Sequence, residues 1–264
     1  MKKINSLSNL IVRNLIKLKK SSERKKQGLV IVDGRREIEE AFKNNWACLN
    51  LFYCSDLDKK KVENNKQFFA LEAYKIIEVS KEIFLKICYK ENPDGYLALI
   101  KTKQINLSDI KVNKESLILV LENVEKPGNL GAIIRTATAV GVSVIIVNDN
   151  QTDIYNPNVI RSSEGHIFSQ IVIGVSVKET IKWLKENKIK SFGAATGNSN
   201  NYTKVDLRDK MALVLGSEAN GLSPEWLKGA DQLIKIPMLA GVDSLNVSVS
   251  AAVILFEVLR QREK

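Results

Sequence analysis

Long apolar runs are missing from this sequence of 264 residues. No stretch approaches the roughly 18 apolar residues that a membrane-spanning helix needs. The opening segment, MKKINSLSNLIVRNLIKLKK, carries charges throughout and lacks the uninterrupted apolar core of a secretory signal peptide. We therefore expect a cytoplasmic protein.

Cysteine is also scarce. The three cysteines, Cys48, Cys54 and Cys88, include no CxxC pair of the kind that holds zinc or cycles between thiol and disulfide. We expect them to be reduced thiols in the core or at the surface.

Negative charge is nearly absent from the first 36 positions. Residues 1–36 contain eleven lysines and arginines against only Glu23 and Asp33, so this segment supplies +9 of the net charge of +10. A solvated helix with scattered lysines is one explanation. The concentration of charge at one end favours an arm that contacts phosphates.

The spacing of apolar residues predicts two α/β modules joined by a polar, aperiodic linker over 102–115. In the first module we expect strands at 29–32, 49–54, 76–79 and 95–101, a capped helix at 80–86, and a polar helix or loop at 55–65. In the second we expect buried parallel strands at 117–121, 144–147, 191–195, 212–215 and 232–236, with a final helix at 251–260. We therefore divide the chain into residues 1–104 and residues 105–264.

The first of three glycine-bearing segments is LENVEKPGNLGAIIRTATAVGV, residues 121–142. A strand ends at Leu121, a Pro-Gly-Asn turn follows, and a helix is expected to begin near Leu130. Such a turn presents backbone N–H groups to an anionic group, but it is not the GxGxxG pattern of dinucleotide-binding proteins. Arg135 on this helix needs a partner, and both a surface salt bridge and a functional contact are open.

The second segment is LVLGSEANGLS, residues 213–223. Gly216 and Gly221 bracket a loop directly after a buried strand, which is where open α/β sheets bind ligands. The residues after Gly221 lack the Lys-Ser/Thr pair of a phosphate loop, so we do not expect hydrolysis of a nucleoside triphosphate. Glu218 in this loop is a candidate site residue.

The third segment is IKIPMLAGVDSLNVSVSAAVILFEVLRQR, residues 234–262. Ser244 is suited to cap a helix that starts at Leu245 or Asn246. Three glycine-bearing loops that each follow a strand of one sheet predict a ligand pocket at the end of that sheet.

Together these segments resemble the motif set of the SpoU (TrmH) family of RNA ribose 2′-O-methyltransferases, in the SPOUT superfamily. PGNLGAIIRTA, LVLGSEANGLS and IPMLAGVDSLNVSVSAA occur in the family's order and spacing, and the resemblance covers residues 117–262. Residues 29–101 more loosely resemble the small N-terminal substrate-binding domain, similar to ribosomal proteins, that many members carry. The resemblance implies a deep trefoil knot in the catalytic domain, S-adenosyl-L-methionine as methyl donor, no metal, and a homodimer whose active site draws on both chains.

Residue by residue, the resemblance implies two sets of site residues. The catalytic set is Asn129, Arg135, Glu218, Ser244 and Asn246. The cofactor-binding set, which acts mostly through backbone groups, is Leu215, Gly216, Ile236, Met238 and Leu245. We expect Arg135 to hold the ribose and 3′-phosphate and to stabilise the alkoxide, and a direct role as base stays open.

Some positions depart from the family pattern. Ala219 stands where many members have glycine. Asn158 and Glu164 stand where a lysine and an apolar residue are expected. His166, the single histidine, matches no catalytic position, and we interpret it as structural.

The N-terminal module favours ribosomal RNA over transfer RNA as the substrate, because members that act on transfer RNA often lack it. A transfer RNA methyltransferase is the alternative within the family. A catalytically inert RNA-binding or ribosome-assembly factor is a second alternative, against which the intact set of polar residues argues. A nucleotide-dependent oxidoreductase fits only the coarse α/β pattern.

Overall fold

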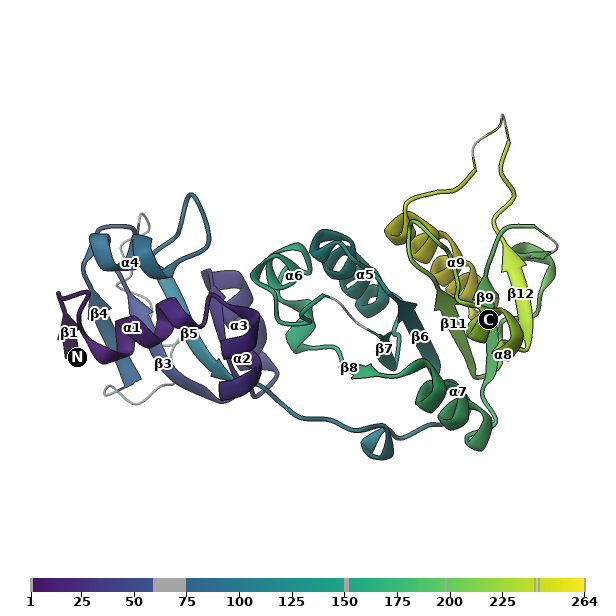
Figure 1. Ribbon diagram of the computed structural model, residues 1–264, viewed down its shortest axis with the longest axis horizontal. Helices are drawn as coiled ribbons and strands as arrows, with labels where there is room; N and C mark the ends of the chain where they lie inside the picture. Colours follow the sequence, from purple (N-terminus) through teal and green to yellow (C-terminus); the bar gives the residue numbers. More distant parts are fainter. Residues whose placement is uncertain are drawn as a thin grey trace. The chain divides into compact units, whose positions relative to one another are not determined.

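The computed structural model describes residues 2–58, 75–149, 152–197, 199–239, 241 and 243–263. It contains two compact units (Figure 1). The first consists of Met1–Gln104 with Tyr155–Ser169, and the second of Ile105–Ile154 with Gln170–Lys264. Most of the helix or loop expected over 55–65 lies outside the described residues.

The first unit is built on a mixed five-stranded sheet of order β1-β4-β3-β5-β2. Its strands are β1 (Lys2–Ile4), β2 (Leu29–Asp33), β3 (Cys48–Tyr53), β4 (Ile76–Val79) and β5 (Tyr96–Lys101). Its helices are α1 (Leu10–Lys17), α2 (Ser21–Gln27), α3 (Arg35–Lys43) and α4 (Lys81–Ile87). β5 runs antiparallel to β2 and β3, whereas β4 runs parallel to β1 and β3. The strands and the helix capped by Ser80 agree with the sequence pattern, but β1, α1 and α2 were not predicted.

The cysteines all lie in this unit, buried and unpaired. Burial raises the pKa of the Cys48 thiol to about 12 and that of Cys88 to about 11. Because the thiolate is the reactive form, burial and the raised pKa values predict low reactivity for Cys48 and Cys88 at neutral pH.

The segment Tyr155–Ser169 belongs to the first unit, although its position in the sequence placed it in the second module. It contains α6 (Pro157–Ser162) and the short 3₁₀ helix η3 (His166–Phe168). The Trp46 indole Nε1 donates a 2.8 Å hydrogen bond to the Phe168 carbonyl oxygen, and the two rings meet edge to face with centroids 5.1 Å apart. Glu164 forms a 2.5 Å ion pair with Arg36. In the structure this segment therefore packs with the first unit, across the division that we place at residue 104, and Glu164 has an internal partner there.

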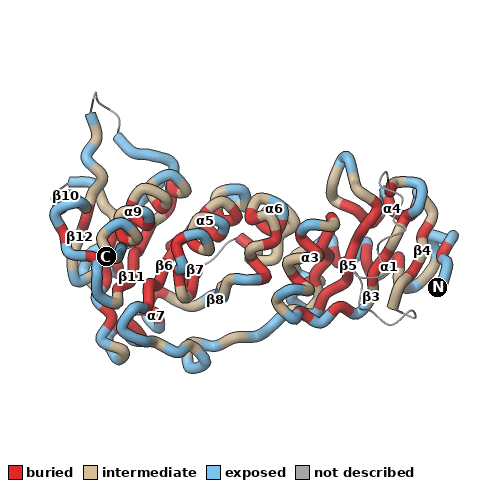
Figure 2. The backbone as a smooth tube through the Cα atoms, turned by 180° about the vertical axis from the view of Figure 1, so that it is seen from behind, coloured by how far each residue is buried: buried red, intermediate tan, exposed pale blue. Residues whose placement is uncertain are grey.

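The second unit contains a seven-stranded sheet of order β10-β12-β9-β11-β6-β7-β8. All of its strand pairs are parallel, which confirms the predicted sheet type. The strands are β6 (Leu117–Glu122), β7 (Val144–Asn148), β8 (Val172–Val175), β9 (Lys190–Ala194), β10 (Asn200–Asn201), β11 (Met211–Leu215) and β12 (Gln232–Lys235). The central strands β6, β7 and β11 are buried along their whole length (Figure 2), as expected for a sheet covered on both faces.

Helices α5 (Pro127–Ala139), α7 (Val177–Glu186), α8 (Pro224–Gly229) and α9 (Val247–Arg262) complete this unit. α9 packs against α5. Across the described parts of the chain, none of the helices combines the length and the apolar character that crossing a membrane requires.

Candidate functional site

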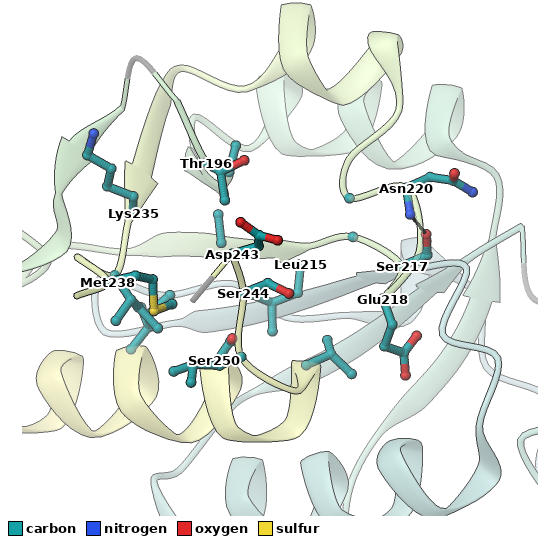
Figure 3. Close-up of a pocket in the computed structure, with 18 of the residues that line it drawn as sticks. Thr196, Leu215, Ser217, Glu218, Asn220, Lys235, Met238, Asp243, Ser244 and Ser250 are labelled. Atoms are coloured by element: carbon teal, nitrogen blue, oxygen red, sulfur yellow. Dashed lines mark hydrogen bonds between the residues drawn. The ribbon is translucent and has the colours of Figure 1, made fainter. Parts of the chain in front are cut away.

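A cavity of about 380 Å³ lies where β9, β11 and β12 end (Figure 3). Because these three strands are parallel neighbours in the sheet, their carboxyl ends meet at one edge, and the loops that follow them can share a pocket. The cavity is lined by residues 194–196, 215–221, 234–236, 238 and 243–245, and by Val247, Ser250 and Ile254 of α9.

The loop after β11 is folded tightly on itself. Ser217 and Gly221 exchange two backbone hydrogen bonds of 3.1 and 3.0 Å, and the Asn220 backbone N–H donates to the Ser217 hydroxyl oxygen. A Cβ atom on Gly216 would lie 2.1 Å from the Gly221 carbonyl carbon, so a side chain has no room there. The fold of the loop places Glu218 at its exposed turn (Figure 3).

Asn129 lies in the first turn of α5, which begins at Pro127 and not near Leu130 as expected. Proline suits the first helical position because its φ is already helical and its missing N–H would have no partner there. The Asn129 side-chain Nδ2 donates a hydrogen bond to Glu218 Oε1. This bond joins the first glycine-bearing segment to the second.

Asn246 joins the third segment to the other two. Its Nδ2 donates to Asn129 Oδ1 at 3.3 Å. Its Oδ1 accepts from the Ser248 backbone N–H at 2.9 Å, which makes Asn246 the N-cap of α9. The prediction that Ser244 caps this helix was therefore wrong, and Ser244 lines the cavity.

The structure brings together nine of the ten site residues suggested by the sequence. Seven of them line the cavity: Leu215, Gly216, Glu218, Ile236, Met238, Ser244 and Leu245. Asn129 and Asn246 are linked to Glu218 by hydrogen bonds. Arg135 is different, because it is exposed on α5 and is not among the residues that line the cavity.

Comparison with known proteins gives this arrangement a family. Residues 116–256 match the model of the SpoU rRNA Methylase family, and residues 9–98 match the MRM3-like substrate binding domain. The chain belongs to the SpoU rRNA methylase family.

Relatives of this SpoU protein match nearly its full length. It is 26% identical over 256 residues to the 23S rRNA (guanosine(2553)-2′-O)-methyltransferase RlmP of Bacillus subtilis (strain 168), covering 97% of this chain and 98% of that protein. A crystal structure of an RNA 2′-O ribose methyltransferase is 34% identical, with a TM-score of 0.84 and coverage of 98% and 99%. The AdoMet-bound rRNA methyltransferase of Sinorhizobium meliloti is 26% identical, with a TM-score of 0.88 and coverage of 98% and 97%.

The sequence patterns missed several residues around the cavity of this SpoU protein. Thr196 follows β9, Lys235 ends β12, and Asp243 and Ser250 belong to the third segment (Figure 3). The Lys235 ammonium donates to the Gly197 carbonyl oxygen at 2.8 Å, which ties the loop after β9 to β12. Position at the end of a predicted strand was the available signal for Thr196, but it becomes informative only once β9 is known to neighbour both β11 and β12.

Proposed function

We propose that this SpoU protein transfers a methyl group from S-adenosyl-L-methionine to a ribose 2′-OH of ribosomal RNA. The observation that carries the proposal is the hydrogen-bonded series Asn246–Asn129–Glu218, which joins all three motif segments beside one cavity. The similarity to RlmP over nearly the full length of both chains and to the AdoMet-bound enzyme of S. meliloti supports the donor and the class of RNA.

The cavity suits such a donor. Its volume of about 380 Å³ lies in the range of small-molecule sites. Leu215, Ile236 and Met238 provide apolar wall for a purine ring, while the carboxylates of Asp243 and Glu218 suit a positively charged ligand. When bound, S-adenosyl-L-methionine supplies the electrophilic methyl group.

The ribose hydroxyl has a high pKa, so it must be polarised or deprotonated and aligned with the methyl group. A guanidinium stays protonated in proteins, and we therefore assign Arg135 to hold the ribose and its 3′-phosphate and to stabilise the developing alkoxide. Glu218 orients Asn129 by accepting its amide hydrogen bond, and Asn246 fixes the other end of the same amide. Ser244 completes the polar set at the cavity wall.

We also propose that the active form is a homodimer in which each cavity is completed by a second copy of the chain. The exposed apolar side chains Leu245, Val249 and Phe256 lie at or along α9, at a spacing that places them on one side of the helix. Arg135 lies outside the residues lining the cavity of its own chain, as expected if it serves a neighbouring cavity. The deep trefoil knot implied by the family resemblance would bring the loops after β11 and β12 to this dimer face.

The direct test is methyl incorporation into defined RNA. The purified chain is incubated with radiolabelled S-adenosyl-L-methionine and either ribosomal or transfer RNA from cells that lack the gene, and the 2′-O-methyl positions are then mapped. We expect label in ribosomal RNA. Label confined to transfer RNA would favour the alternative substrate, and the absence of label from both would favour an inert RNA-binding factor.

We assign the first contact with RNA phosphates to the exposed basic side chains of α1, α2 and the turn between them. These are Arg13, Lys17, Lys20, Lys25 and Lys26. In the described part of the chain none of these five forms an ion pair. The turn that presents them is held by the buried Arg24, whose Nη1 donates 2.8 Å hydrogen bonds to the carbonyl oxygens of Leu18 and Lys19.

Replacing Lys17, Lys20 and Lys26 together by glutamine should weaken binding to ribosomal RNA and reduce its dependence on salt. Because each lost phosphate contact removes about 0.7–0.9 from the slope of log K against log salt concentration, the slope should fall by about 2. Filter binding at several salt concentrations measures it. The matched control replaces Lys178, Lys182 and Lys185 of α7, which removes the same charge and should leave the slope unchanged. Equal slopes for the two triple variants would refute the assignment.

A further inference from the structure

Glu122, the last residue of β6, is a buried carboxylate outside the cavity lining. Glu122 is only 2% exposed. Its Oε2 accepts a 2.8 Å hydrogen bond from the backbone N–H of Ser223. Burying a carboxylate destabilises the fold unless the carboxylate is hydrogen-bonded. The hydrogen bond from Ser223 is therefore needed to keep Glu122 at this buried position.

Ser223 is the point at which the loop after β11 ends and α8 begins. The Ser223 hydroxyl accepts from the Trp226 backbone N–H at 3.3 Å and so caps α8. The fully buried Trp226 donates its indole N–H to Asn148 Oδ1 at 3.1 Å. Glu122 and Asn148 are paired in register at the ends of β6 and β7. The exit of the loop is therefore fixed to the ends of two central strands.

The same two chain segments meet again at the site itself. Glu122 and Asn129 flank the connection from β6 to α5, whereas Glu218 and Ser223 lie in the connection from β11 to α8. The bond from Ser223 to Glu122 joins the two segments at the end of β6, which we call the base of the loop. The bond from Asn129 to Glu218 joins them a second time beside the cavity. Two separate attachment points fix the relative orientation of two segments, whereas a single one leaves rotation free.

We propose that Glu122 is a positioning residue for methyl transfer, which acts by holding the base of the loop so that Glu218 meets Asn129 beside the cavity. This role rests on the proposed function. The hydrogen bond carries it, so an acceptor oxygen at the same place should suffice and the negative charge should be dispensable.

The test compares Glu122→Ala with Glu122→Gln. Because a misplacement of about 1 Å at a reacting group can cost on the order of 100-fold in rate, we expect Glu122→Ala to lower kcat by about 10- to 100-fold. The KM for S-adenosyl-L-methionine should rise by a smaller factor than kcat falls, since the cavity walls after β9 and β12 do not depend on this bond and only the wall after β11 does. Glu122→Gln retains an acceptor oxygen and should restore kcat to near the wild-type value.

A structural control removes a bond of the same kind at the other end of the sheet. Asp231 Oδ2 accepts a 2.8 Å hydrogen bond from the Ser191 backbone N–H, where β9 and β12 begin. Asp231→Ala should lower the melting temperature without lowering kcat below that temperature. A loss of kcat in Asp231→Ala comparable to that in Glu122→Ala would reduce Glu122 to a general stabilising role and overturn the proposal.

Amide hydrogen exchange of residues 217–221 gives a readout that does not need turnover. Exchange should be faster in Glu122→Ala than in the wild type or in Glu122→Gln, and unchanged exchange with unchanged kcat would overturn the proposal. If the wild-type chain showed no methyl transfer, that result would count against the proposed function. Amide hydrogen exchange of residues 217–221 would still show whether Glu122 holds the loop. If Glu122→Ala does not fold, Glu122→Asp replaces it in the test. Aspartate keeps the negative charge but is one methylene shorter, so its oxygen no longer reaches the Ser223 N–H, and we expect the same loss of kcat.

Discussion

Alanine in place of Arg135 should lower the rate of methyl transfer by about 100- to 1,000-fold, the usual effect of removing one group that stabilises developing negative charge. Binding of S-adenosyl-L-methionine should be unaffected, because Arg135 is assigned to the ribose and 3′-phosphate of the RNA and not to the donor. Single-turnover methylation of ribosomal RNA measures the rate, and calorimetric titration measures binding of the donor.

Lysine at position 135 is the informative control. It keeps the positive charge but loses the planar fork that binds a phosphate through two parallel hydrogen bonds. We expect the rate of Arg135→Lys to fall between those of the wild type and the alanine variant. Near-normal turnover of Arg135→Ala on its own RNA would remove Arg135 from the mechanism.

The second unit could be predicted largely from sequence because its signals are local. β6, β7 and β11 are continuous apolar runs, and such runs are typical of strands buried on both faces. Parallel strands bring their carboxyl ends to one edge, so the three glycine-bearing loops that follow β6, β11 and β12 were expected to converge. The edge strands gave no such signal, since β10 has two residues and β8 is a four-residue strand that is only partly buried.

The start of the first unit was harder to predict because its helices are short and flanked by basic residues. In α1 only Val12 and Leu15 are buried, and the exposed positions include the apolar Leu10 and Ile16 as well as basic residues, so no clean apolar face marks the helix. The sequence was therefore interpreted as a charged arm, whereas it forms two helices with a core side. The inclusion of Tyr155–Ser169 in this unit depends on Trp46 and Arg36, whose contacts with this segment span more than a hundred positions and leave no local pattern.

The details of the site show the same limit. Serine and asparagine are both good helix caps, and the sequence could not decide between Ser244 and Asn246. Asn246 caps α9 and also reaches Asn129, which is a tertiary contact. Glu122 was missed for a related reason, because its partner Ser223 is 101 positions away.

Alanine in place of Gly216 should strongly weaken binding of the methyl donor. The added Cβ would lie 2.1 Å from the Gly221 carbonyl carbon and 2.4 Å from the Leu222 nitrogen, both of which are backbone atoms that cannot move aside independently. Overpacking of this kind costs about 1–3 kcal/mol or forces the loop to rearrange. We expect affinity for S-adenosyl-L-methionine to fall by about 10- to 100-fold or more, as measured by calorimetric titration.

Gly128→Ala is the matched control. Gly128 lies in the first turn of α5 next to Asn129, and a Cβ there meets no atom within 4 Å. This variant should bind the donor normally. If both glycine variants bound the donor equally well, the tight closure of the loop at Gly216 would have no part in forming the cofactor site.

The two inactive variants together test whether a site is shared between chains. If Arg135 serves the cavity of a second copy, a mixed dimer of Arg135→Ala with Gly216→Ala has one site with both defects and one with neither. Random mixing of equal amounts should then restore about a quarter of the wild-type activity. If each site draws both residues from one chain, every site in the mixture keeps one defect and activity stays lost. The mixture is assayed at a donor concentration well below the raised Kd of Gly216→Ala, where each variant alone has little activity. Turnover above the sum of the two variants must then come from a site built by two different chains.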